Sequence, residues 1–209
     1  MHNKINKFSF QGFHGAYSEL AGKNIYPNSE SIPCKTFEEM FETVKNKKAE
    51  RAIVPLENSR AGRVADTQRL IPYSDLKIIG EYFLEIKHCL LASDKATINS
   101  IKRVHSHEQA LAQCRNNLIT KNISMHTAAD TAGAAKEVAE LNNLEDSAIA
   151  SKLAAKIYNL KILQDDIQDA TKNITRFVIM SREMQEIDPY EKGTMSTLVY
   201  QVKSIPAAL

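Results

Sequence analysis

The segment Asn173–Phe177 places a hydroxyl, a fixed cation and an aromatic ring on consecutive residues. Thr175, Arg176 and Phe177 lie at the start of the apolar run Phe177–Met180, as expected of a strand that enters a core. Neighbouring side chains of a strand point to opposite faces, so Thr175 and Phe177 share one face and Arg176 lies on the other. A threonine at a strand end can donate its hydroxyl proton into a cleft, and an arginine can hold a carboxylate by two parallel hydrogen bonds. The alternative is an ordinary edge strand with a solvated arginine.

The segment Gln11–Ser18 directly follows the predicted strand Lys7–Phe10 and contains two glycines. A glycine turn that leads into a helix leaves backbone N–H groups free to bind an anion, and Ser18 could add its hydroxyl. The segment lacks the Gly-Lys-Ser/Thr ending of a phosphate-binding loop. It is interpreted either as a carboxylate site or as a plain turn between a strand and a helix.

Three polar residues, Glu57, Asn58 and Ser59, come at the carboxyl end of the predicted strand Ala52–Pro55. The site residues of α/β folds usually lie at such strand ends. The alternative is a polar loop in which Asn58 or Ser59 caps the helix that follows.

Another strand end carries two histidines, His105 and His107. No third ligand at a plausible spacing accompanies them, so we expect no metal site. Ser106 and Gln109 have the spacing of a helix capping box. Gln113 lies two turns along the same helix, near the face of Ser106, and its apolar neighbours make it a candidate site residue.

The composition excludes several classes of protein. The chain has 209 residues, of which 43% are hydrophobic and 25% charged, and its net charge of +2 is too small to indicate a nucleic acid or an anionic membrane as partner. Three widely spaced cysteines without a CxxC pair argue against a disulfide framework and against zinc. The N-terminus is polar and no run approaches the ~20 apolar residues of a membrane span. We therefore expect a reduced, cytoplasmic setting.

Short apolar runs alternate with helical periodicity along the chain, which predicts parallel sheets covered by helices. Thr36 and Glu39 predict the start of one helix, and Asp130 the start of another. The extended segment Gly80–Leu91 is interpreted as a crossover between two lobes. We expect strands at Lys7–Phe10, Ala52–Pro55, Lys77–Ile79, Cys89–Ala92, Arg103–Ser106, Ile123–His126, Ala148–Ala150 and Arg176–Met180.

The chain resembles the prephenate dehydratase family over roughly residues 7–182. The resemblance rests on the joint order and spacing of short segments, namely Gly15–Glu19, Pro55–Ser59, His88–Leu90, Ser106–His107 with Gln113–Cys114, Ala148–Ser151 and Asn173–Phe177. It implies an α/β fold with two lobes of the type-2 periplasmic-binding-protein kind and an active site in the interlobe cleft. It further implies no cofactor, no metal and a homodimer or homotetramer.

The resemblance also divides the chain into parts. Residues 1–185 would form the catalytic domain, with one lobe at about 7–83 plus 166–182 and the other at about 84–165. Residues 186–193 would be a linker, and residues 194–209 would be the first strand of a truncated ACT regulatory domain. The ending Pro206-Ala207-Ala208-Leu209 departs from the usual Pro-Gly-Ala-Leu of the family. An L-phenylalanine effector is expected only if that domain is complete.

The activity that the resemblance implies is the decarboxylating dehydration of prephenate to phenylpyruvate in phenylalanine biosynthesis. Thr175 would assist the leaving hydroxyl, with Glu57 as the acid if it is buried, or with a water relay instead. Arg176 would hold the pyruvyl carboxylate. Further substrate-binding residues would be Asn58, Ser59, Ser106, Gln113, Ser18, Asn173 and Phe177, the last packing beneath the site.

Two other functions fit the same sequence. An arogenate dehydratase would act on the amino analogue of prephenate through the same chemistry. A non-catalytic, two-lobed α/β module would bind a small ligand without converting it. Neither composition nor motif spacing separates the first alternative from prephenate dehydration, because any of several polar residues could distinguish a keto group from an ammonium group.

Overall fold

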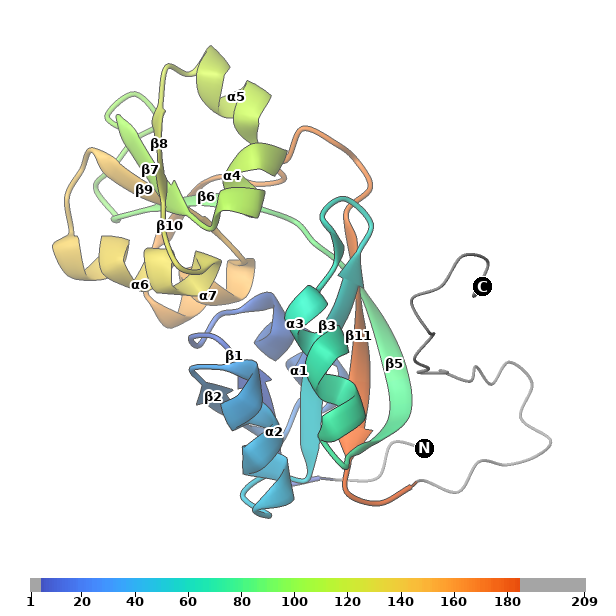
Figure 1. The fold of residues 1–209 in the computed structure, drawn as a ribbon. Coiled ribbons are helices and arrows are strands. Elements are labelled where there is room, and N and C mark those ends of the chain that lie inside the picture. The colour runs from blue at the N-terminus through green and yellow to red at the C-terminus, as the bar shows by residue number, and fades with distance from the viewer. Residues whose placement is uncertain (1–4, 185–209) are drawn as a thin grey trace, which may run out of the picture.

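The computed structural model describes residues 5–184, which form two α/β lobes (Figure 1). Each lobe is built around one β-sheet, and the chain crosses between the lobes twice. The crossing segments touch each other, since the backbone N–H of Ile86 donates to the carbonyl of Asn173 at 2.7 Å. The predicted linker at 186–193 and the predicted ACT strand at 194–209 lie outside the described residues.

The first lobe contains a sheet in which three neighbouring strands run parallel to one another and the strand next to them runs antiparallel to both of its neighbours. Its strand order is β2 (Glu30–Cys34), β1 (Lys7–Gln11), β3 (Arg51–Asn58), β11 (Ile174–Ser181) and β5 (Lys77–Glu85), with β4 (Gly62–Arg63) paired to β3. Its helices are α1 (Tyr17–Ile25), α2 (Phe37–Lys45), α3 (Ala65–Leu70) and the short 3₁₀ helix η1 (Ile71–Tyr73).

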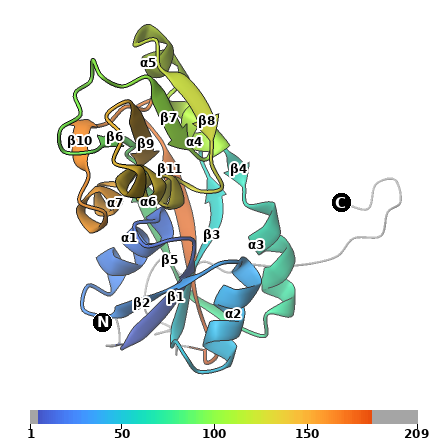
Figure 2. The same cartoon turned by 90° about the vertical axis from the view of Figure 1, so that its left-hand side faces the viewer.

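The sheet of the second lobe also mixes parallel and antiparallel pairs. Strand β7 runs parallel to both of its neighbours, and strand β6 runs antiparallel to both of its neighbours. Its strand order is β10 (Lys161–Gln164), β6 (Cys89–Ala92), β9 (Asp146–Ala150), β7 (Arg103–Ser106) and β8 (Ser124–Thr127). Its helices are α4 (Glu108–Gln113), α5 (Arg115–Thr120), α6 (Thr131–Leu141) and α7 (Lys152–Ile157). Helices α6 and α7 lie on the side that faces α1 of the first lobe, as the perpendicular view of Figure 2 also shows.

The predicted two-lobed α/β fold is confirmed, and the expected parallel pairing holds for part of each sheet, while the other pairings are antiparallel. Only a crossover connection, usually a helix, forces consecutive strands to run parallel. Strands β6 and β11 each follow a segment that crosses from the other lobe. No helical connection within the same sheet therefore forces them to run parallel to their neighbours. The sequence pattern also missed β2, β4 and β10, which are short or polar and, in β2, contain Pro33.

Helices cover both faces of the middle of the first sheet, which explains the nearly continuous apolar runs within β3 and β11. Phe8, Phe10 and Ile53 pack against α1 on one face. Val54 and Met180 pack against α2 and η1 on the other. Since side chains alternate along β11, Phe177 joins the α1 face and Val178 the opposite face.

Two of the three predicted helix starts are confirmed. Thr36 accepts a hydrogen bond from the backbone N–H of Glu39 at 3.1 Å, and Asp130 caps α6 in the same way. The predicted capping box at Ser106 is wrong, because α4 begins one residue later with His107 as its cap. Ser106 is buried and donates its hydroxyl to the carbonyl of Ile149 at 2.7 Å.

The three cysteines are buried free thiols, and burial raises the pKa of Cys89 and of Cys114 to about 12. Neither thiol is therefore ionised at neutral pH, so neither has the thiolate that nucleophilic catalysis requires. No helix within residues 5–184 has both the length and the apolar character needed to cross a membrane.

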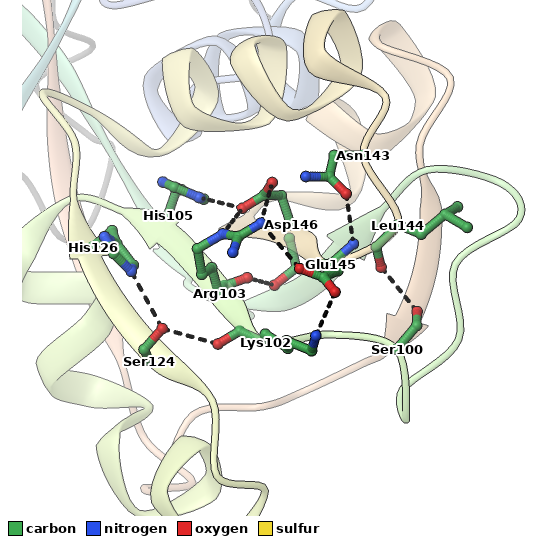
Figure 3. A network of polar contacts seen from close by, with 11 residues as sticks. Ser100, Lys102, Arg103, His105, Ser124, His126, Asn143, Leu144, Glu145 and Asp146 are labelled. Atoms are coloured by element: carbon green, nitrogen blue, oxygen red, sulfur yellow. Dashed lines mark hydrogen bonds and ion pairs between the residues drawn. The ribbon is translucent and has the colours of Figure 1, made fainter.

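A cluster of ion pairs joins β7 to β9 at their amino ends (Figure 3). Asp146 accepts two hydrogen bonds from Arg103, at 2.7 and 3.1 Å, and one contact from His105 at 3.0 Å. The Arg103 guanidinium, aided by His105 and opposed by burial, lowers the pKa of Asp146 to about 2. The carboxyl ends of these strands lead instead toward the cleft between the lobes.

Asp146→Asn is expected to lower the free energy of unfolding at pH 7 by on the order of 2 kcal/mol. A depressed carboxyl pKa stabilises the fold above the unfolded pKa of about 3.9 and loses this effect as the pH falls through about 2. Urea unfolding at pH 7 and at pH 2.5 should therefore show a difference between variant and parent that shrinks at acid pH. Asp94→Asn, at an exposed position, is the control. An Asp146→Asn effect that is equal at both pH values would contradict this account.

Candidate active site

A cavity of about 230 Å³ lies between the lobes, and both lobes and the first crossing segment line it. This volume lies just below the roughly 300–1,000 Å³ of drug-sized ligand pockets, so the cavity suits a small ligand. Within the described part of the chain, its lining includes no lysine and no arginine. The residues that line it are Gln11, Gly12, Ala16, Tyr17, Ser18, Pro55, Asn58, Val64, Ile86, His88, His107, Gln109, Ala110, Gln113, Asp130, Thr131, Thr175 and Phe177.

The amino ends of helices from both lobes reach this cavity. Ala16, Tyr17 and Ser18 bring the start of α1, and Asp130 and Thr131 bring the start of α6. Free backbone N–H groups and the helix dipole favour an anion at such ends. At α6 the Asp130 carboxylate already accepts from the Gly133 N–H at 2.7 Å, so the start of α1 is where the cavity can attract a carboxylate without a cationic side chain.

The glycine turn before α1 also touches the second lobe. Gly15 has a φ of +93°, and a Cβ placed on it would lie 2.7 Å from the Cα of Ala154 in α7. Its carbonyl accepts a hydrogen bond from the Ser151 hydroxyl at 2.6 Å. Glycine is thus required both for the backbone conformation and for the close approach of the lobes.

Thr175 lies at the floor of the cavity and is 9% exposed. It is paired in register with Asn58 of β3, whose side-chain amide donates to Thr175 Oγ1 at 2.8 Å. Asn58 is held in this orientation because its Oδ1 accepts from the backbone N–H groups of Arg60 and Ala61, at 2.9 and 2.8 Å. Thr175 Oγ1 therefore receives a hydrogen bond and keeps its own proton for an acceptor that enters the cavity.

A chain of hydrogen bonds continues from Asn58 into the second lobe. The Asn58 amide also donates to Asn173 Oδ1 at 2.8 Å, and Asn173 Nδ2 donates to Gln113 Oε1 at 2.7 Å. The same Gln113 oxygen lies 2.8 Å from His88 Nε2, and His88 Nδ1 lies 2.8 Å from the Tyr17 hydroxyl. Residues far apart in the sequence thus form one network across the cleft.

Burial controls the ionisation of the two aromatic members of this network. It lowers the pKa of His88, against a smaller raising effect of Gln113. It raises the pKa of Tyr17 well above its usual value. At neutral pH both side chains are therefore uncharged, so the network is a set of neutral hydrogen bonds.

The structure does not bring Glu57 and Arg176 to the cavity. Because Glu57 pairs in register with Arg176, and Asn58 with Thr175, the first pair points to the opposite face of the sheet. Arg176 forms ion pairs with Glu57 at 3.2 Å and with Glu81 at 2.8 Å. The Glu57 side chain is 51% exposed, so the burial required for its expected acid role is missing.

Two serines among the predicted substrate ligands also have other roles. Ser59 Oγ accepts from the backbone N–H of Ile174 at 2.9 Å and so fixes the start of β11. Ser106 is fully buried within the second lobe. By contrast, Ser18 and Phe177 line the cavity, with Phe177 1% exposed, as a residue that packs beneath the site would be.

Arg176→Leu is expected to leave KM within about threefold of the parent value, because the guanidinium lies on the far face of the sheet. The free energy of unfolding should fall by on the order of 1 kcal/mol as partly exposed ion pairs are lost. Steady-state kinetics and urea unfolding measure the two effects. A large rise in KM with unchanged stability would instead restore the carboxylate-binding role first expected of Arg176.

Sequence reasoning missed Tyr17, His88 and Asp130 as cavity residues. The hydrogen-bond partners of His88 are 71 and 25 residues away in the chain, so its sequence neighbours give no signal of them. Tyr17 lies in the glycine segment that was singled out as an anion site. The sequence predicts Asp130 only as a helix cap. Because the start of helix α6 faces the cavity, its cap Asp130 lines the cavity as well.

Comparison with known proteins gives one consistent result. A family model described as prephenate dehydratase matches residues 8–185. An Arabidopsis thaliana protein named arogenate dehydratase/prephenate dehydratase 2, chloroplastic, is 41% identical over 207 residues, covering 97% of this chain and 53% of the relative. A Komagataeibacter europaeus protein named bifunctional N-acyl-homoserine lactone acylase/prephenate dehydratase is 41% identical, covering 96% of this chain and 72% of the relative.

A solved structure shares the fold. The crystal structure of prephenate dehydratase from Arthrobacter aurescens, in complex with L-Phe, superposes with a TM-score of 0.79 at 30% identity and covers 86% of this chain and 61% of that one. The chain spans about half the length of the plant relatives that it matches.

Proposed function

Because the chain belongs to the prephenate dehydratase family, we propose that it converts prephenate to phenylpyruvate, CO2 and water. The observation that carries this proposal is the Thr175 hydroxyl, which accepts a hydrogen bond from Asn58 and keeps its proton for the cavity. Loss of the ring hydroxyl of prephenate needs a proton donor at the departing oxygen. Thr175 has this role in the proposed reaction.

The reaction restores an aromatic ring, so much of its driving force lies in the substrate. The ring C–carboxylate bond breaks to release CO2, and its electron pair moves into the ring. The C–O bond to the ring hydroxyl breaks in turn, and this oxygen takes a proton and leaves as water. The protein has to orient the substrate and assist the departure of this oxygen.

The cavity supports this chemistry by its lack of lysine and arginine among the residues described as lining it. A cation paired with the carboxylate that leaves would stabilise the ground state, in which that carboxylate carries full charge, more than the transition state. Helix amino ends and neutral amides hold anions without such a fixed counter-charge. Gln113 and the start of α1 are our candidates for these contacts.

The proton that Thr175 delivers has to be replaced, and Glu57 does not lie where it could replace it. A threonine hydroxyl is a weak acid on its own, so we propose that water within the cavity relays the proton. This retains the second of the two proton sources expected from the sequence.

A second candidate function is the dehydration of arogenate. Arogenate carries an α-ammonium group in place of the keto oxygen of prephenate, and Asp130 places a carboxylate on the cavity wall. A carboxylate favours an ammonium group over a keto group. Several plant relatives are named arogenate dehydratases.

The test is turnover of both substrates by the purified protein, with kcat/KM measured for each. Conversion of prephenate at the higher kcat/KM supports the proposal, and a higher value for arogenate selects the second candidate. Binding of either compound without product would show a ligand-binding module instead. Addition of L-phenylalanine and size-exclusion chromatography of the same sample test the proposed effector and the proposed homodimer or homotetramer.

A further inference from the structure

We propose that His88 is a positioning residue that holds the Thr175 hydroxyl in its proton-donating orientation through Gln113, Asn173 and Asn58. The inference rests on the proposed function, in which Thr175 assists the leaving hydroxyl. It follows from the direction of each hydrogen bond in the network, which the geometry determines from one end to the other.

The direction is set first at Asn58. Its Oδ1 accepts from two backbone N–H groups, those of Arg60 and Ala61, and a backbone amide can only donate. The Asn58 NH2 group must therefore face Asn173 and Thr175 and donate to both, at 2.8 Å each. These two backbone donors therefore assign the orientation of the Asn58 amide.

Each later step then has one solution. Asn173 accepts with its oxygen, so its NH2 group donates to Gln113 Oε1 at 2.7 Å. Because Gln113 presents its oxygen, His88 Nε2 at 2.8 Å must carry a proton and donate to it. Neutral His88 then has a lone pair on Nδ1, so the Tyr17 hydroxyl donates its one proton to this nitrogen at 2.8 Å and not to the Lys87 carbonyl, which lies 3.1 Å away.

The opposite arrangement is costly at every link. A flipped Gln113 amide would direct its NH2 group at the NH2 group of Asn173, and a flip of Asn173 would create the same conflict with Asn58. A flip of Asn58 would leave two backbone N–H groups facing another NH2 group. The donation from His88 therefore stabilises the single arrangement in which Thr175 Oγ1 receives a hydrogen bond from Asn58.

His88 also ties this arrangement to the relative position of the lobes. Tyr17 and Asn58 belong to the first lobe, Gln113 to the second, and His88 to the crossing between them. Both of its ring nitrogens are engaged, so it has no free site from which to exchange a proton with the substrate. We therefore assign it an effect on the orientation of Thr175 and not a catalytic role.

The first test reads the tautomer directly. In a nitrogen-15 spectrum of histidine-labelled protein near pH 7.5, we expect the His88 signal, identified by its loss in His88→Gln, to show a protonated Nε2 and an unprotonated Nδ1. A protonated Nδ1 with a bare Nε2 would overturn the proposal, since His88 could not then donate to Gln113. This measurement needs no substrate, so it stands even if neither prephenate nor arogenate is converted.

The second test compares two replacements of the ring. His88→Phe keeps the ring and removes both nitrogens, and we expect kcat to fall by about 10- to 100-fold while KM stays within about threefold. In His88→Gln the amide nitrogen takes the place of Nε2 and donates to Gln113, so kcat should stay within about threefold of the parent. Equal impairment of the two variants would overturn the proposal.

A double-variant cycle separates positioning from a general structural effect. If His88 acts through the Thr175 hydroxyl, His88→Phe should change kcat by less than about twofold in a Thr175→Val background. If the two substitutions instead lower kcat by factors that multiply in the double variant, His88 does not act through the Thr175 hydroxyl and the proposal is refuted. Thermal unfolding checks that each variant is folded, and if His88→Phe fails to fold, His88→Asn, whose shorter amide reaches the Nδ1 position and not the Nε2 position, breaks the same link and replaces it in the cycle.

Discussion

Thr175→Val is expected to lower kcat by about 10²-fold or more, while KM changes by less than about threefold. Valine has nearly the shape of threonine, so the strand and the packing beside Phe177 should persist. The only group removed is the hydroxyl that accepts from Asn58 and faces the cavity. Steady-state turnover of prephenate, or of arogenate if that is the preferred substrate, measures the loss.

Thr175→Ser is the matched control, because serine keeps the hydroxyl and loses only a methyl group. We expect it to retain kcat within about tenfold of the parent, the remaining loss coming from a less restricted side-chain rotamer. Turnover by Thr175→Val close to that of the parent would exclude Thr175 as the proton donor. The departing oxygen would then have to take its proton from water alone.

Asn58→Asp is expected to lower kcat by about 10²-fold although it changes only one NH2 group to an oxygen. One carboxylate oxygen would still accept from the backbone N–H groups of residues 60 and 61. The other would accept the Thr175 proton, which would then point at the carboxylate instead of at the substrate. The variant thus keeps the hydroxyl and reverses its direction.

The added charge should also raise KM for an anionic substrate, so kcat at saturation is the quantity to compare. Asn46→Asp, at the exposed carboxyl end of α2, introduces the same charge away from the cavity lining and should leave both constants unchanged. If Asn58→Asp raised KM alone, the direction of the Thr175 proton would not matter for catalysis. The effect of Asn58 would then be electrostatic.

Local sequence patterns were sufficient for the features that depend on neighbouring residues. The predicted strand at Arg176–Met180 lies within β11, and alternation correctly placed Thr175 and Phe177 on one face and Arg176 on the other. The same alternation already implied that Thr175 and Arg176 could not both face one cleft directly. Assigning both to the substrate followed from the resemblance and not from the strand geometry.

The register between strands β3 and β11 determines which of their polar side chains face the cavity, and local sequence patterns do not contain this register. The register that sets Asn58 beside Thr175 also sets Glu57 beside Arg176 and leaves Glu57 half exposed. A shift of one residue would set Glu57 or Ser59 beside Thr175 in place of Asn58, because successive side chains of a strand alternate between faces. Nothing within either segment alone contains this register.

By itself, the sequence determined the two-lobed α/β architecture, the apolar faces of the main strands and the family to which the chain belongs. Periodicity and motif order are local or additive signals, so they can be read without coordinates. Only the tertiary structure decided that Tyr17, His88, Gln113, Asn173, Asn58 and Thr175 form one network. A hydrogen bond requires atoms about 3 Å apart, and residues this distant in the chain reach that separation only after both lobes have folded and met.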